Sequence, residues 1–176
     1  MKKVFITIIW LIIITLLRWD WGWYLILLWT GGILGIFLFQ LDHLFYVLIV
    51  YPQQGTSLVI KKFIHQQKLK QAFQILRQTT AERIRLPFRN ALFQVFLTFF
   101  CFWVLTSTNN WFGKALVMSL FLQLLKHQLT FLFNKKDESL RQQLFWLIKA
   151  PISFKAQKFF VIFGLISFVL LNLLLI

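Results

Sequence analysis

Residues 23–39 read WYLILLWTGGILGIFLF, an apolar run without a single charged side chain. The run continues with a few polar residues to Tyr51, and Pro52 ends it. As one helix, residues 23–51 would be about 43 Å long, which exceeds the roughly 30 Å hydrocarbon core of a bilayer. Either this helix tilts strongly or its last two turns leave the membrane. We favour a membrane span over residues 23–41, followed by an interfacial extension.

Four further apolar runs lie on either side of this one. They cover residues 4–17, 88–106, 112–133 and 159–176. The composition agrees with a lipid environment, because 59% of the residues are hydrophobic, 14% are charged, and 22 are Phe. A water-exposed chain of this kind would aggregate. We therefore predict an all-α polytopic membrane protein of about five transmembrane helices plus cytoplasmic amphipathic helices, with residues 1–176 forming one integral membrane domain.

The basic residues alternate between successive connections. Lysines begin the chain, residues 53–89 hold eight basic residues against one acid, and residues 135–158 hold six against two. The connections at residues 18–22 and 107–114 are short, aromatic and nearly neutral. Basic loops remain on the cytoplasmic side of a membrane. The pattern predicts a multi-pass protein of the cell membrane with a cytoplasmic N-terminus and an outside C-terminus. Since the same rule explains the net charge of +14, nucleic acid is not an expected partner.

Residues 53–89 are predicted to form a basic cytoplasmic amphipathic helical segment, as one helix or a helical hairpin. Their apolar residues recur at spacings of three and four, and cations occupy much of the opposite side. We expect this face to bind the anionic lipid headgroups of the bilayer or a membrane or cytoplasmic protein partner; alternatively, its charges serve only to set the topology. The candidate lipid-binding residues are Lys61, Lys62, Lys68, Lys70, Arg83, Arg85 and Arg89.

Three ionisable residues within the apolar runs are candidates for a metal or proton site. Counted from Trp23 at the outer end of its span, Asp42 lies about 28 Å along the helix axis. Counted from Trp111 in the same way, His127 lies about 24 Å along its own helix. The two residues are therefore expected at a similar depth in the membrane. Together with His43 they would offer carboxylate and imidazole ligands to a divalent metal. The alternative, which we favour, is an ion pair between Asp42 and Lys126 beside two interfacial histidines. Neighbours on a helix point in different directions, so Asp42 and His43 cannot easily share one ion.

Gly31, Gly32 and Gly35 lie within the run of residues 23–39 and include a Gly-x-x-x-Gly spacing. Small residues at this spacing allow two helices in a membrane to approach closely. We predict that these glycines are a helix-packing site, either within the chain or between copies.

No P-loop, zinc-protease, Cys-x-x-Cys or Gly-x-Ser-x-Gly motif is present in the sequence. We therefore expect a non-enzymatic integral membrane protein that uses its basic cytoplasmic face and needs no cofactor. The first alternative is a membrane-embedded, metal-dependent hydrolase-like site at Asp42, His43 and His127, and only this alternative requires a divalent metal. The second alternative is a subunit of an oligomeric transporter or channel, because five spans alone enclose little pore.

Residues 38–43 read LFQLDH, which resembles the L-P-D-L-D-H signature of predicted membrane-bound metal-dependent hydrolases. The resemblance implies that Asp42 and His43 are retained metal ligands. The sequence departs from that signature at Gln40, which stands where the family has its first Asp, and the family's His-Arg-Gly-x-Thr-His element is missing. The whole chain also resembles small bacterial multi-span membrane proteins, a resemblance that implies no particular activity.

Overall fold

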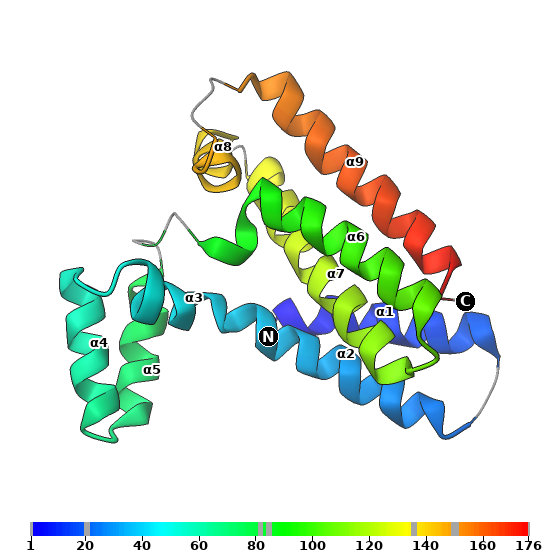
Figure 1. Cartoon of the computed structure of the whole chain (residues 1–176), viewed down its shortest axis with the longest axis horizontal. Coiled ribbons are helices and arrows are strands. Elements are labelled where there is room, and N and C mark those ends of the chain that lie inside the picture. Colours follow the sequence, from blue (N-terminus) through cyan, green and yellow to red (C-terminus); the bar gives the residue numbers. More distant parts are fainter. Residues whose placement is uncertain are drawn as a thin grey trace.

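The computed structural model of the chain is helical, and it describes residues 2–19, 22–80, 83, 86–134, 137–148 and 152–175 (Figure 1). Within these residues there is no β-strand, which confirms the prediction of an all-α fold. The elements in chain order are α1 (Lys2–Arg18), α2 (Tyr24–Gln40), α3 (Asp42–Phe45), the π-helix η1 (Tyr46–Val50), α4 (Gly55–His65), α5 (Leu69–Gln78), the 3₁₀ turn η3 (Pro87–Arg89), α6 (Ala91–Ser107), α7 (Trp111–Phe133), α8 (Asp137–Phe145) and α9 (Phe154–Leu173).

Three of the described helices are long and apolar enough to cross a membrane. They are the continuous helical run Tyr24–Val50, which joins α2, α3 and η1, together with α7 and α9. At 27 residues the first of them is about 40 Å long. Two further apolar helices, Val4–Arg18 and Ala91–Ser107, are shorter than 18 residues.

Side-chain caps determine where helices α6 and α9 begin, and neither helix begins at the first residue of its apolar run. The third apolar run was expected to become helical from Phe88, but α6 begins at Ala91 because the Asn90 side chain accepts a hydrogen bond from Phe93 N at 2.7 Å. Asparagine is a strong N-cap, and it leaves η3 as a separate turn before the helix. The fifth run becomes helical earlier than expected, since Ser153 caps the start of α9.

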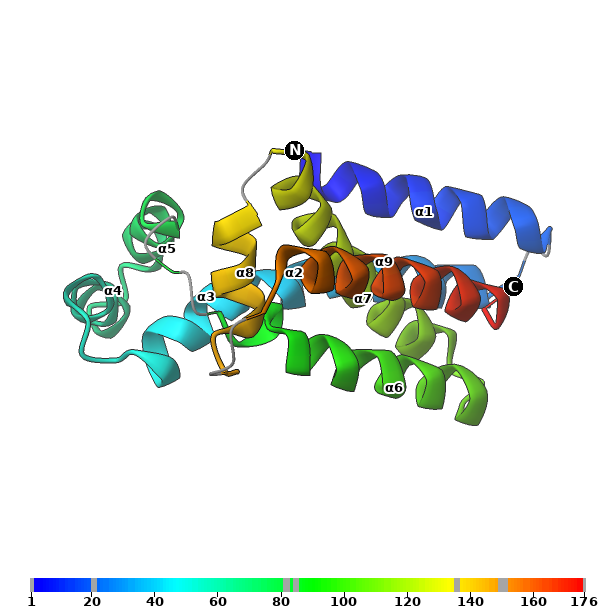
Figure 2. The same cartoon turned by 90° about the horizontal axis from the view of Figure 1, so that it is seen from above.

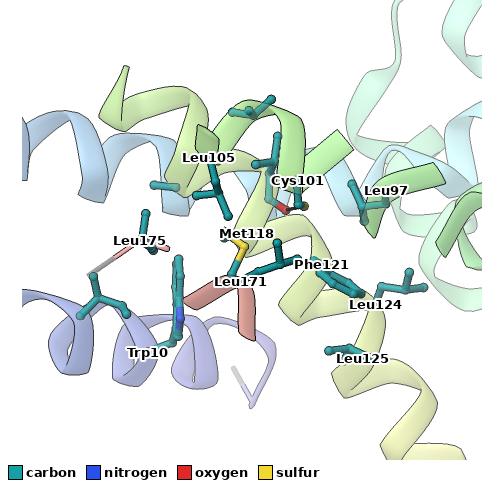
Figure 3. Packing of buried hydrophobic residues seen from close by; sticks show 14 of the residues in the cluster. Trp10, Leu97, Cys101, Leu105, Met118, Phe121, Leu124, Leu125, Leu171 and Leu175 are labelled. Carbon is teal, nitrogen blue, oxygen red and sulfur yellow. Dashed lines mark hydrogen bonds between the residues drawn. The ribbon is translucent and has the colours of Figure 1, made fainter. Parts of the chain in front are cut away.

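Helix α7 lies at the centre of the bundle and packs against α1, α2, α6 and α9. Figure 3 shows Met118 and Phe121 of α7 pointing towards Cys101 of α6 and Leu171 of α9. Met118, Phe121 and Cys101 have no exposed surface. Cys101 is thus one of the small apolar residues of this core.

The three glycines of α2 lie where other helices approach it closely. A Cβ added at Gly31 would meet the backbone oxygen of Phe112, and one added at Gly35 would lie 2.8 Å from the backbone oxygen of Leu116. Both contacts are with α7, so the Gly-x-x-x-Gly pair faces the central helix of the same chain. Gly32 faces α1, because an added Cβ there would lie 2.8 Å from the Leu11 side chain.

The connections gather at two opposite ends of the bundle. Figures 1 and 2 show the hairpin of α4 and α5 at one extreme of the molecule and α8 towards the same end. The C-terminus and the connection between α6 and α7 lie at the other end. In Figure 1 the hairpin helices run crosswise to α2, from which they are reached through α3 and η1.

Candidate functional site

Four elements bring polar side chains together around Arg89, at the bundle end that carries the hairpin. Asp42 and His43 begin α3, His127 lies near the end of α7, and Gln143 belongs to α8. Arg89 closes the η3 turn immediately before the capping residue of α6. It is only 5% exposed, and Asp42 is completely buried. We refer to Asp42, His43, Arg89, His127 and Gln143 as the Arg89 cluster.

The Asp42 carboxylate holds two successive residues of the η3 turn. One of its oxygens accepts a hydrogen bond from Phe88 N at 3.0 Å. The other lies 3.1 Å from Arg89 Nε, where it forms a buried ion pair. These two bonds join the segment that enters the hairpin to the segment that leaves it. The Asp42 side chain therefore fastens the base of the hairpin, a role for which a buried, hydrogen-bonded charge pair is well suited.

The rest of the guanidinium faces two histidines and an aromatic ring. Arg89 Nη2 lies 3.0 Å from His43 Nε2, and Nη1 lies 3.3 Å from His127 Nε2 and 3.5 Å from its Nδ1. The guanidinium carbon is 4.9 Å from the centre of the Phe39 ring. An arginine nitrogen is always a donor, so a hydrogen bond from Arg89 to either histidine uses an unprotonated ring nitrogen as its acceptor.

His127 connects the Arg89 cluster to α8. Its Nε2 lies 2.7 Å from Gln143 Oε1, so the ring contacts α8 as well as Arg89. Burial lowers the pKa of Arg89 below its ordinary value, and the Asp42 carboxylate opposes that shift. An arginine pKa starts so high that the side chain remains a cation. The cluster is thus an arginine cation in contact with one carboxylate and two imidazole rings.

This arrangement brings together the residues that the sequence offered for a metal site, but it places a cation among them. Asp42, His43 and His127 each contact Arg89. Within the described residues, no group of three or more His, Cys, Asp or Glu side chains is placed to hold a metal ion. A guanidinium at the point where the ligands meet also repels a divalent cation. The alternative prediction of an ion pair was right about Asp42 but wrong about its partner, which is Arg89 and not Lys126.

Two of the seven residues expected to face lipid headgroups are instead buried. Arg89 belongs to the cluster described above, and Arg83 is 2% exposed. Arg83 donates hydrogen bonds to the Leu76 carbonyl oxygen at 2.9 Å and to Thr79 Oγ1 at 2.5 Å. It therefore satisfies the carboxyl end of α5, where a cation is favoured. Arg85 lies outside the described residues.

The four lysines among those candidates lie on the α4–α5 hairpin. Lys62, Lys68 and Lys70 are exposed, and Lys61 is half-buried. The predicted basic amphipathic segment is thus a pair of helices connected by a tight turn, with the lysines distributed over both helices and the turn. Apolar side chains pack between the helices and against η1 (Tyr46, Val47, Ile60, Ala72 and Leu76).

Sequence reasoning missed Arg89 as the centre of the polar cluster, and it missed Gln143 altogether. The signal for Arg89 was Asn90, because a strong N-cap residue leaves the preceding side chain outside the helix and able to turn back into the protein. Nothing in the sequence distinguishes Gln143 from the neighbouring polar residues of α8.

A comparison with models of known protein families finds no match for this chain, and neither do comparisons with curated proteins or with solved structures.

Proposed function

We propose that the chain is an integral membrane protein whose basic α4–α5 hairpin binds the anionic lipid headgroups of the cytoplasmic leaflet. In this proposal α1, α2, α6, α7 and α9 all cross the cell membrane. The N-terminus, the hairpin and α8 lie in the cytoplasm, and the C-terminus lies outside. The protein is non-enzymatic and acts by holding the hairpin at the membrane surface.

The outward faces of the two shorter helices support five crossings. In α6, Phe96 and Phe99 are 61% and 71% exposed, and Phe5 of α1 is 64% exposed. Aromatic side chains in these numbers are stable against lipid and costly against water. A helix of 17 residues is about 26 Å long. This is a few ångströms short of a typical hydrocarbon core, and a bilayer accommodates such a difference by thinning locally.

The charge of the hairpin is the observation that carries the proposal. Residues 53–80 contain four lysines and one arginine but no aspartate or glutamate. Each lysine near an anionic membrane surface contributes about 1 kcal/mol to attraction. Apolar side chains lie exposed beside these charges, among them Leu58, Val59 and Phe73. Cations together with exposed apolar residues are typical of helices that lie in the membrane interface.

The Arg89 cluster supports the proposal by giving the hairpin a fixed place. The Asp42 carboxylate joins α3 to η3, and His127 and Gln143 connect the same point to α7 and α8. A hairpin held at its base in this way is presented to the membrane in one orientation. Less of the binding free energy is then spent on ordering it.

The test measures the depth of the hairpin in lipid bilayers with the full-length protein. A nitroxide is attached at Gln66→Cys, an exposed position in the turn between α4 and α5, in a Cys101→Ala background. We expect the label to lie deeper in nanodiscs containing about 30% phosphatidylglycerol than in pure phosphatidylcholine, and about 1 M salt should reverse the difference. Lys68→Gln/Lys70→Gln should lower the docking equilibrium constant about 30-fold, since two contributions of about 1 kcal/mol are lost.

A variant with the same loss of charge provides the control. Lys155→Gln/Lys158→Gln removes two exposed lysines from α9, and it should leave the depth of the Gln66→Cys label unchanged. Equal label depths in neutral and anionic nanodiscs would exclude the proposed lipid binding. Topology is tested separately with Asn109→Cys, in the exposed connection between α6 and α7. An impermeant maleimide should label Asn109→Cys from outside and Gln66→Cys only after the membrane is opened.

A further inference from the structure

An apolar cavity of about 150 Å³ lies between the hairpin and the π-helix that precedes it. All eight residues of its wall are apolar (Leu44, Leu48, Ile60, Ile64, Leu69, Ala72, Phe73 and Leu76). A cavity of this size with aliphatic and aromatic walls accepts an apolar guest on the order of benzene in size. One of its walls is η1, and π-helices are rare elements that occur often at functional sites.

The rim of this cavity is open and continues into the lipid-facing side of α2. Leu69 and Phe73 are 54% and 52% exposed, so a guest reaches the cavity without passing through the core. On the preceding helical run, Phe37, Leu41, Phe45 and Leu48 are all exposed. Spacings of three and four place these four side chains along one stripe of the helix. The stripe forms an apolar track from the spanning part of α2 to the wall of the cavity.

Cations lie beside the same cavity. Lys68 and Lys70 flank Leu69, and both are exposed. Lys70 also lines a shallow hollow with Gln74 and Gln78, and this hollow shares Phe73 with the apolar cavity. An apolar pocket and a basic, hydrogen-bonding hollow thus meet at one aromatic side chain.

From this juxtaposition we infer that the hairpin binds an anionic lipid of the bilayer as a specific ligand. Part of one acyl chain occupies the apolar cavity, and the phosphate lies against Lys68 and Lys70. The inference rests on the proposed function, since it requires the hairpin to lie at a membrane surface, and it adds a defined site to that surface attraction. The apolar track along α2 provides the path by which the chain of a bilayer lipid enters.

The charge and the size of the site favour a lipid over a second copy of the chain. A second hairpin would bring its own lysines against Lys68 and Lys70, and like charges repel. A helix, about 10 Å wide, covers a cavity of 150 Å³ but does not enter it. A single acyl chain enters it, and an anionic headgroup on the same molecule complements the cations.

The test uses the full-length protein in nanodiscs that contain a trace of phosphatidylglycerol with a photoactivatable diazirine on one acyl chain. Phosphatidylcholine with the same acyl chain is the matched probe. After illumination, the labelled peptides are identified by mass spectrometry. We expect phosphatidylglycerol to label peptides that contain the cavity wall and phosphatidylcholine to label them about 30-fold less, the change expected when the attraction of both lysines is lost.

Two variants fill or cover the cavity. Ala72→Leu places three additional carbons into it from a residue that is 3% exposed, and Leu48→Trp covers its rim from a residue that is 42% exposed. Each should reduce labelling about 10-fold, whereas Ala156→Leu, at an exposed alanine of α9, should not. Circular dichroism shows whether each variant is folded. The rim variant adds nothing to the packed interior, so it remains informative if Ala72→Leu misfolds.

Each contrary result identifies what has failed. Labelling that persists in both cavity variants overturns the acyl-chain site, while the depth of the nitroxide label still reports separately on surface docking. Equal labelling by phosphatidylglycerol and phosphatidylcholine overturns the claim that the site selects an anionic headgroup. If the depth of the Gln66→Cys label is also the same in neutral and anionic nanodiscs, the proposed function fails as well.

Discussion

Replacing Asp42 by asparagine removes the negative charge from the Arg89 cluster and keeps the size of the side chain. The amide oxygen can still accept the hydrogen bond from Phe88 N, so the main loss is the charge opposite Arg89, 3.1 Å away. Removing one partner of a buried ion pair typically costs about 3–5 kcal/mol, because the other charge remains buried without compensation. The two histidines and the Phe39 ring remain beside the guanidinium, and we therefore expect the lower end of this range, about 3 kcal/mol.

The free energy of unfolding is measured by titrating the full-length protein in mixed micelles with increasing fractions of SDS and following its circular dichroism. A double-mutant cycle with Arg89→Met isolates the pair from the rest of the network. If Asp42 and Arg89 stabilise each other, the double variant loses less than the sum of the two single losses, by about 2 kcal/mol.

The ion pair between Arg141 and Glu138 on α8 is the matched control. Its charged atoms are closer, at 2.8 Å, but both side chains are substantially exposed. Glu138→Gln should therefore cost no more than about 0.5 kcal/mol. If Asp42→Asn costs as little as Glu138→Gln, or if the two single losses add in the double variant, Asp42 does not fasten the base of the hairpin.

Two further substitutions test packing and capping. Gly35→Ala should lower the free energy of unfolding by about 1–3 kcal/mol, because the new methyl group would meet the backbone of α7 at 2.8 Å. Gly113→Ala is the control, since the nearest neighbours of its new methyl group would lie 4.0 Å away. In the same SDS titration this control should be neutral or stabilise the protein by up to about 1 kcal/mol. Arg83→Met should cost about 1 kcal/mol locally by removing the donors to Leu76 and Thr79. In this variant, amide hydrogen exchange at the end of α5 should become faster, while exchange in α7 stays unchanged. If exchange at the end of α5 is equally fast in Arg83→Met and in the unmodified protein, Arg83 does not cap that helix.

The helical fold was predictable because long apolar helices can be recognised from composition and length. The run that opens at Trp23 and the run that ends at Phe133 correspond to the two longest helices. The apolar runs 88–106 and 159–176 do not coincide with the starts of helices α6 and α9, for one shared reason. Single capping side chains, Asn90 and Ser153, decide where those helices begin, and the hydropathy of the neighbouring residues does not reveal them.

The shared depth of Asp42 and His127 was also predictable, since it follows from counting residues along two helices that start from the same face. Their common contact with Arg89 was not. Arg89 reaches Asp42 across 47 positions of sequence, and the path between them depends on how tightly the hairpin turns. In the sequence Arg89 is one more basic residue before an apolar run, which the positive-inside rule already explains.

The separation between Asp42 and Arg89 also indicates why a charged pair lies at this point of an otherwise apolar bundle. Bringing together the ends of a flexible segment of 47 residues costs on the order of 3 kcal/mol in loop-closure entropy. Contacts at the base of the hairpin must offset this entropic cost, and the bonds from Asp42 to Phe88 N and to Arg89 are among them. Apolar contacts would close it less specifically, because the hydrophobic effect has no direction and a ring such as that of Phe88 packs against many apolar side chains. A carboxylate that requires one guanidinium and one backbone N–H fixes a single register, and the lysines beside the apolar cavity are thereby held at a constant place relative to α2.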